Sequence, residues 1–295
     1  MVAGAEEAPE AAGATAVAEG SVVAAVSEDL AGGAPVAVAQ AAAGSGEDKM
    51  VPEAKIEENI KEFVEKARGA AGANLQSLIL YGSAASGDYH SEFSNVNLFC
   101  VVRDSSYAKM QALASVVKWW DKQRQPVPLV MTEEELNRST DVFTIELLDM
   151  KQHHRVLWGD DVLKNLEVPM NIHRVQVEYE LREKLLLLRQ HLLLADTDEN
   201  RIRELLIRSV SSFATLFRHA LIALGENAPA SKRESVAAIA RRLGFNDSAM
   251  ERVLAVREHK ASAKTLAARQ IVGEYLESVE KVTAAVDRML APGRP

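Results

Sequence analysis

Apolar residues recur at helical spacing between residues 53 and 70, and two apolar runs of strand length follow at 75–81 and 95–102. A helix at about 105–122 and a strand at about 127–132 come next. Residues 143–153 favour another helix, and 156–158 a short strand. This alternation predicts a small unit in which helices pack on a sheet.

The pattern changes after about residue 172, where long helical periods replace the alternating strands and helices. The clearest period runs over 201–224, whose apolar positions form one broad face. About five helices are expected in this part, because loop signals rich in Asp, Gly and Asn interrupt it. We therefore expect an α+β protein, in which an α/β domain with a mixed sheet (51–165) precedes an α-helical bundle (170–292).

Residues 1–50 are rich in Ala, Gly, Val and Glu, and they contain too few large apolar side chains to form a core. This segment holds eight acidic residues and one lysine, so it accounts for seven of the eight net negative charges of the chain. We predict that it is a disordered tail. The rest of the chain is close to neutral and has no basic stripe, so no nucleic-acid partner is expected.

Two further absences in the sequence narrow the expected location. No run of about 18 apolar residues is present, so no membrane span is expected. Cys100 is the single cysteine, which excludes a disulfide within the chain and fits a reducing compartment. We predict a cytoplasmic protein.

The segment with the clearest chemical pattern is a strand that ends in Gly82-Ser83. A phosphate loop of the Walker type would need Lys and then Ser or Thr after Gly87, but Asp88 and Tyr89 stand there. A dinucleotide-binding turn would need three glycines at the opening of a helix, and that spacing is absent. Both of these phosphate-binding motifs are therefore rejected.

Gly82-Ser83 and the following Asn95-Val96-Asn97 together resemble the signature of the nucleotidyltransferase superfamily, which includes aminoglycoside nucleotidyltransferases and small enzymes of some toxin–antitoxin pairs. In that family a strand ends in Gly-Ser, and an Asp-hydrophobic-Asp (or Glu) pair lies on the next strand. The resemblance covers about residues 55–160, and the bundle only by type. It implies that Gly82 and Ser83 bind phosphate and that positions 95 and 97 would hold Mg²⁺.

Asn95 and Asn97 replace the two metal-binding carboxylates of that pattern. Side chains alternate along a strand, so these two would share one face. An amide is neutral and is a weaker ligand for Mg²⁺, and the loss of about 4 kcal/mol of transition-state stabilisation would slow a reaction roughly a thousandfold. We expect no metal ligands at these positions and Mg²⁺ only if the protein is active.

Three functions follow from this reading. The first is a catalytically impaired member, a pseudoenzyme, that binds a nucleotide such as ATP or another NTP and serves a regulatory role. The second is an active nucleotidyltransferase that moves a nucleoside monophosphate to a small hydroxylated acceptor. The third is a scaffold without enzymatic activity, whose bundle binds a protein partner.

Several other acidic residues are candidates for a metal ligand or a catalytic base. The strand at 127–132 lacks the third carboxylate of the family, and the glutamates at 133–135 fit the acidic first turn of a helix capped by Thr132. Asp88, Glu92 and Asp104 lack the spacing of the missing pair. Glu146 and Asp149 would share a helix face, for which the pattern favours exposure. The resemblance implies a substrate-side role for such acids near the domain junction, as ligands of a cationic substrate or as a base.

Overall fold

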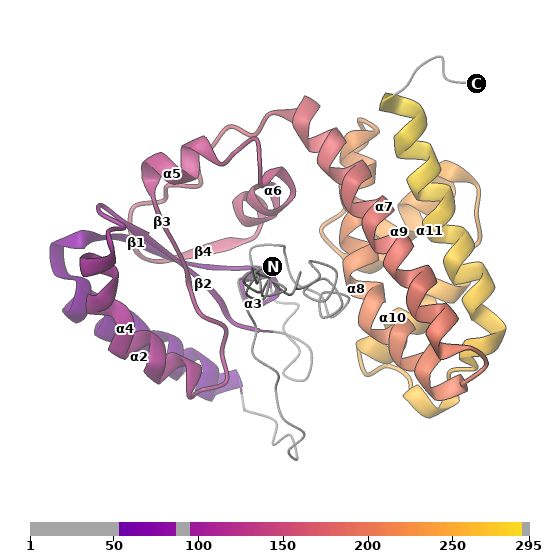
Figure 1. Ribbon diagram of the computed structural model, residues 1–295, viewed down its shortest axis with the longest axis horizontal. Coiled ribbons are helices and arrows are strands. Elements are labelled where there is room, and N and C mark those ends of the chain that lie inside the picture. The colour runs from indigo at the N-terminus through magenta and orange to yellow at the C-terminus, as the bar shows by residue number, and fades with distance from the viewer. Residues whose placement is uncertain (1–52, 87–94, 291–295) are drawn as a thin grey trace, which may run out of the picture.

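The protein is described by a computed structural model over residues 53–86 and 95–290. The predicted tail and the residues Asp88 and Glu92 lie outside the described residues. The first part of the chain forms a mixed sheet with helices on both faces, and the second part forms a helical bundle (Figure 1). The α+β class, with a mixed sheet followed by a bundle, is therefore confirmed.

Four strands form the sheet, in the order β3-β2-β1-β4. The β1 strand pairs antiparallel with β2 and with β4, whereas β2 pairs parallel with β3. β1 and β2 are therefore central, and β3 and β4 lie at opposite edges of the sheet although they follow each other in the chain. The bounds are β1 Leu75–Tyr81, β2 Asn97–Val102, β3 Leu129–Thr132 and β4 His154–Gly159.

One face of the sheet is covered by α2 (Glu53–Ala71) and α4 (Tyr107–Asp121), which lie side by side (Figure 1). Phe63 of α2 meets Trp120 of α4 edge to face, with ring centroids 5.0 Å apart. Alternate residues of β2, among them Cys100, pack into this layer. Each face of the sheet thus has its own apolar core.

The opposite face is covered by α5 (Glu133–Arg138) and α6 (Thr144–Gln152). Leu147 and Met150 of α6 pack there, whereas Ile145 belongs to the core of the bundle. This short helix therefore contributes to two hydrophobic cores. It lies between the sheet and the bundle and contacts α7 (Figure 1).

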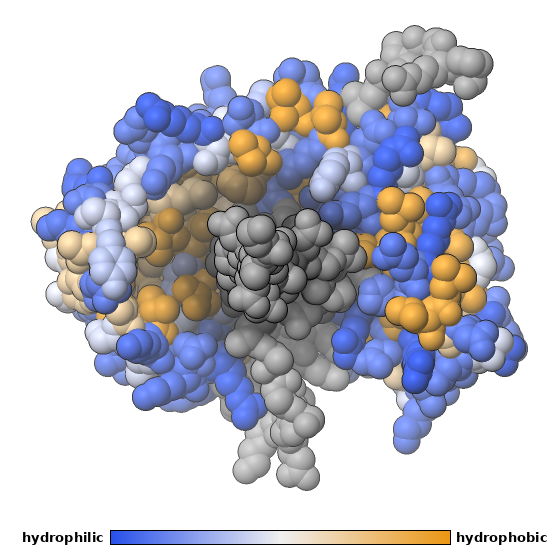
Figure 2. All heavy atoms as spheres, in the orientation of Figure 1, coloured by the Kyte–Doolittle hydropathy of each residue, from blue (hydrophilic) through white to orange (hydrophobic). Residues whose placement is uncertain are grey.

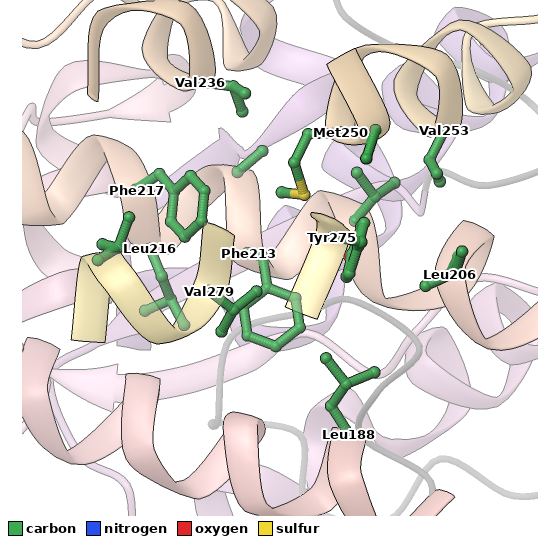
Figure 3. Packing of buried hydrophobic residues seen from close by; sticks show 14 of the residues in the cluster. Leu188, Leu206, Phe213, Leu216, Phe217, Val236, Met250, Val253, Tyr275 and Val279 are labelled. Carbon is green, nitrogen blue, oxygen red and sulfur yellow. The ribbon is translucent and has the colours of Figure 1, made fainter. Parts of the chain in front are cut away.

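The bundle has α8 at its centre, in contact with α7, α9, α10 and α11. Figure 3 shows Phe213 and Phe217 of α8 in one cluster with Met250 and Tyr275. The hydroxyl oxygens of Tyr275 and Ser209 are 2.9 Å apart, which gives a fully buried phenol a partner. The bounds are α7 Met170–Ala195, α8 Glu199–Ala223, α9 Lys232–Leu243, α10 Ser248–Arg257 and α11 Ala268–Leu290.

The α8 helix is the one candidate for a membrane span among the described residues, by length and hydropathy alone. Its most apolar window is 72% buried inside the protein. A hydrophobic helix surrounded by other helices is the usual centre of a bundle. This helix is accordingly described as a core helix.

Two strand boundaries differ from the prediction for identifiable reasons. The strand predicted at 95–102 begins at Asn97, because the backbone N–H of Val96 donates to Oε1 of Gln125 at 3.0 Å and not to a neighbouring strand. The strand predicted from 127 begins at Leu129, after Pro126 and Pro128, which have no N–H to donate to a ladder. The other predicted strands and helices of this part lie within a few residues of their predicted bounds.

Candidate functional site

The turn after β1 is shaped by Gly82, whose φ of +76° lies in the left-handed region that favours glycine. Its N–H donates to the carbonyl oxygen of His153 at 3.3 Å, and its own carbonyl accepts from the N–H of Ala85 at 2.9 Å. The chain then forms α3 (Ser83–Ser86), a single turn of four residues. Such a short helix has little dipole, so the backbone of Gly82 and the hydroxyl of Ser83 are the groups that could approach a phosphate.

Asn97 faces this turn. It pairs with Tyr81 in the antiparallel ladder of β1 and β2, and directly opposed residues point to the same face of a sheet. A Cβ atom on Gly82 would lie 3.1 Å from Nδ2 of Asn97, so the amide occupies the space beside the glycine. The structure thus brings the predicted Gly82 and Asn97 together.

Asn95 is placed differently from the prediction. It is exposed and precedes β2, so the two asparagines do not lie on one strand. The diversion of the neighbouring Val96 N–H to Gln125 accounts for the late start of the strand. Of the two predicted metal positions, only Asn97 is part of the sheet.

The glutamates after β3 have local structural roles. Glu133 accepts from Nε2 of Gln76 at 2.6 Å, Glu134 pairs with Arg138, and Glu135 forms a capping box with Thr132. The predicted acidic first turn is confirmed. Asp104 is exposed and accepts from the N–H of Ser106. Within the described residues, no three His, Cys, Asp or Glu side chains gather in a group that could hold a metal ion.

Glu146 is buried, so the prediction of an exposed face is wrong for this residue. Its exposed fraction is 5%, because α6 lies between the sheet and the bundle. Oε2 accepts a long hydrogen bond of 3.4 Å from Nε2 of Gln176, whereas Oε1 has no hydrogen-bond partner among the described residues. Burial, with the nearby charge of Glu180, raises the pKa of Glu146 to about 7.

Glu146 also acts on Tyr81, the residue directly before Gly82. Burial and then the charge of Glu146 raise the pKa of the Tyr81 phenol to about 12. The turn and α6 are also joined through the backbone, because the N–H of Gly82 donates to the carbonyl of His153, the residue directly after α6. The acid of α6 and the glycine turn therefore belong to one neighbourhood.

Asp149 is engaged by the bundle. One of its oxygens, Oδ1, accepts hydrogen bonds from Arg218 and, at 2.6 Å, from Nε2 of His219. Burial alone would raise the pKa of Asp149, but the His219 and Arg218 side chains lower it below the usual range. Because this side chain is 28% exposed and already bonded, the predicted polar face is only partly correct for it.

Two histidines extend this connection. Nδ1 of His219 lies 2.9 Å from Nε2 of His173, and Nδ1 of His173 has no hydrogen-bond partner among the described residues. Which ring donates in this contact depends on the tautomers of the two histidines. Burial lowers the pKa of His173 to about 4, so this ring is neutral near pH 7.

Four residues of this cluster were not predicted from the sequence: His173, Gln176, Arg218 and His219. The sequence of α8 did contain an indication, because Arg218 and His219 stand between the apolar residues Phe217 and Ala220 on a largely buried helix. Polar residues on a buried helix face require partners, but the sequence does not say which. The nearby Asp161 is not part of this cluster: it lies 3.1 Å from Nε2 of His154 and accepts from the N–H of Leu163.

No protein-family model matches this sequence, and no curated protein matches it. Among solved structures, the chain is similar to spectinomycin adenyltransferase AAD(9) from Enterococcus faecialis, solved with ATP and spectinomycin. The match covers 78% of this chain and 99% of that one, at 14% sequence identity and a TM-score of 0.48. This likeness concerns the overall arrangement of the chain alone.

Proposed function

We propose that this protein binds a nucleotide such as ATP at the Gly82 turn and that its capacity for nucleotidyl transfer is impaired. The observation that carries the proposal is the amide of Asn97 beside Gly82. In the superfamily that the motif resembles, a metal-binding carboxylate occupies that position. An amide in its place keeps the shape of the site and removes the charge that would hold Mg²⁺.

The same amide supports binding without a metal ion. Gly82 has no side chain to keep a phosphate away, although its own N–H already donates to the carbonyl of His153 at 3.3 Å. Nδ2 of Asn97 is a hydrogen-bond donor, whereas a carboxylate would repel phosphate unless a cation lay between them. Transfer is a different matter, because it relies on Mg²⁺ to neutralise the charge that develops on the leaving group.

Glu146 is the candidate residue for contact with a second substrate, the acceptor of the nucleotidyl group. Its Oε1 has no hydrogen-bond partner among the described residues, and its pKa near 7 suits both proton acceptance and pairing with a cation. In an active nucleotidyltransferase it would be the base for an acceptor hydroxyl. Asp149 adds negative charge there, but its Oδ1 is already shared by two donors. We assign Glu146 the direct role and Asp149 the supporting one.

A scaffold function is favoured by a separate observation on the bundle. Exposed apolar side chains follow one face of α7 at intervals of three, four or seven residues, and Figure 2 shows apolar surface on the bundle. A seam of this spacing suits contact with another helix. The side chains are Ile172, Val175, Tyr179, Leu186 and Leu193. This observation supports a protein partner, and it is compatible with nucleotide binding elsewhere.

Calorimetric titration of the full chain with ATP, in Mg²⁺ and then in EDTA, tests the proposal. Binding of similar strength in both buffers is expected, together with loss of binding in Gly82→Val. Binding that requires Mg²⁺, accompanied by pyrophosphate release, would overturn the impaired reading in favour of an active enzyme. The absence of binding in both buffers would reject the nucleotide proposal and leave the scaffold function.

A further inference from the structure

The N-terminus of α6 is capped by a residue of the bundle. Phe143, at the N-cap position, makes no side-chain hydrogen bond. Oε1 of Gln176, in α7, instead accepts from the N–H of Thr144 at 2.8 Å, from its hydroxyl at 2.5 Å and from the N–H of Ile145 at 3.3 Å. The first N–H groups of a helix lack partners within the helix, so an acceptor here stabilises α6.

This cap fixes the orientation of the Gln176 amide. An amide has an accepting oxygen and a donating nitrogen, and the three donors of α6 require the oxygen. The nitrogen must then point the other way, where Nε2 lies 3.4 Å from Oε2 of Glu146. Thr144 thus contacts the amide oxygen of Gln176, and Glu146 contacts its amide nitrogen. The helix cap and the placement of the buried acid are set by the same residue.

We propose that Gln176 is a positioning residue for Glu146. The Gln176 amide occupies Oε2 of the Glu146 carboxylate and leaves Oε1 for a single hydrogen-bond donor of a ligand. A hydroxyl or an ammonium group has the chemistry that fits the remaining oxygen. The identity of that ligand rests on the proposed function. The action of Gln176 on Glu146 does not, and it can be measured in the ligand-free protein.

Charged and titratable groups from several elements surround this acid. Burial raises the pKa of Glu146 most, and the charges of Glu180 and Asp149 raise it further, whereas its own backbone N–H and then the Gln176 amide lower it. Lys184 pairs with Glu180 at 3.8 Å, which reduces the effect of that charge. The remaining groups are Tyr81 of β1, His173 of α7, and Arg218 and His219 of α8. Removal of the amide donor should therefore tighten the hold of Glu146 on its proton.

Two substitutions separate the two roles of Gln176. Gln176→Glu retains an oxygen for the N–H groups of α6, but it loses the donor and adds a negative charge beside Glu146. Gln176→Leu removes both the acceptor and the donor. Thr144→Val is the matched control, because it deletes the hydroxyl bond to Gln176 and leaves the amide in place.

The readout is the titration of Glu146 in full-length protein labelled with ¹³C at the glutamate side-chain carboxyl, assigned by its absence in Glu146→Gln. We expect the midpoint to rise by about one pH unit in both Gln176 variants and to stay unchanged in Thr144→Val. Midpoints equal to wild type in both Gln176 variants would overturn the proposal and leave Gln176 as a helix cap alone. If Gln176→Leu does not fold, an unchanged midpoint in Gln176→Glu, which keeps the cap, still overturns the proposal. A failure of ATP to bind would refute the proposed function without altering this result.

Discussion

The carboxylate of Asp149 in α6 accepts a hydrogen bond of 2.6 Å from Nε2 of His219 in α8. The same oxygen accepts from Arg218, whose side chain is 10% exposed, and the His219 side chain is fully buried. His219 in turn contacts His173 of α7. The carboxylate of Asp149 therefore binds α8 directly and is connected to α7 through His219.

We predict that Asp149→Asn lowers the free energy of unfolding by about 2–3 kcal/mol at pH 7. Removing one partner of a buried ion pair leaves the other charge uncompensated, and the partial exposure of Asp149 softens this effect. Urea denaturation measures it. Asp287→Asn is the control, because the Arg182–Asp287 pair is about half exposed and should contribute less than about 1 kcal/mol. Equal effects of the two substitutions would mean that the junction does not depend on the Asp149 charge.

The pH dependence of this effect has a defined sign. The pKa of Asp149 is lower in the folded protein than its ordinary value of 3.8, so its contribution is complete above that value. The contribution is lost as the pH falls through the lower, folded-state pKa. The difference in stability between wild type and Asp149→Asn should thus be constant from pH 7 to about 5 and shrink below about 4. A difference that grows in acid would contradict the assignment.

Glu146 should have the opposite pH dependence. Its pKa is raised from 4.5 to about 7, so the folded protein holds this proton more tightly than the unfolded chain does. Wild type should therefore lose stability as the pH rises from 4.5 to 7. We predict that Glu146→Gln is more stable than wild type by up to about 3 kcal/mol at pH 8, with a small difference at pH 5.

Urea denaturation at pH 5 and pH 8 tests this prediction. Glu58→Gln is a suitable control, because the Glu58 side chain is 69% exposed and pairs with Lys55 at the surface. Its substitution should change stability by less than about 0.5 kcal/mol at both pH values. If Glu146→Gln is no more stable at pH 8 than at pH 5, relative to wild type, the carboxyl does not titrate near neutrality.

Local patterns were sufficient to predict much of the fold and the glycine turn. The strand at 75–81, its ending at Gly82 and the cap at Thr132 all depend on residues within a few positions of one another. The strands at 75–81 and 95–102 are close in sequence, as expected of neighbours in one sheet, whereas the antiparallel register that brings Asn97 beside Gly82 is known from the structure. The predicted features need only periodicity, turn chemistry and strand pairing of neighbours.

The burial of Glu146 could not be predicted in this way. Its hydrogen-bond partner Gln176 is 30 residues away, and the partners of Asp149 are 69 and 70 residues away. The spacing of Glu146 and Asp149 is the same on an exposed face and on a helix enclosed between the sheet and the bundle. A weak indication existed, since Ile145, Leu147 and Met150 leave α6 without a consistently polar side.

Gly82 should tolerate a side chain poorly. We predict that Gly82→Ala lowers the free energy of unfolding by about 1–2 kcal/mol, because φ is +76° and the new Cβ would lie 3.1 Å from Nδ2 of Asn97. Gly69→Ala is the matched control with the opposite sign. Gly69 lies in α2 with no atom within 4 Å of an added Cβ, so the substitution should stabilise by roughly 0.5–1 kcal/mol. Thermal and urea denaturation of both variants measure the contrast, and a neutral Gly82→Ala would refute the geometry of the turn.

The amide of Asn97 provides the most direct test of the candidate phosphate site. We predict that Asn97→Asp weakens ATP binding in EDTA about tenfold or more, because a carboxylate beside Gly82 would repel a phosphate oxygen. In Mg²⁺ the loss should be smaller, because a cation can bridge the carboxylate and the phosphate. Calorimetric titration in the two buffers measures both values.

Asn137→Asp makes the same chemical change on the exposed surface of α5, and it should leave ATP binding unchanged in both buffers. If Asn97→Asp behaves like this control, Asn97 does not face bound phosphate, even though it lies beside Gly82. If Asn97→Asp instead creates binding that requires Mg²⁺, a single charge is enough to restore a metal position at this turn. The amide would then be the feature that makes nucleotide binding independent of metal.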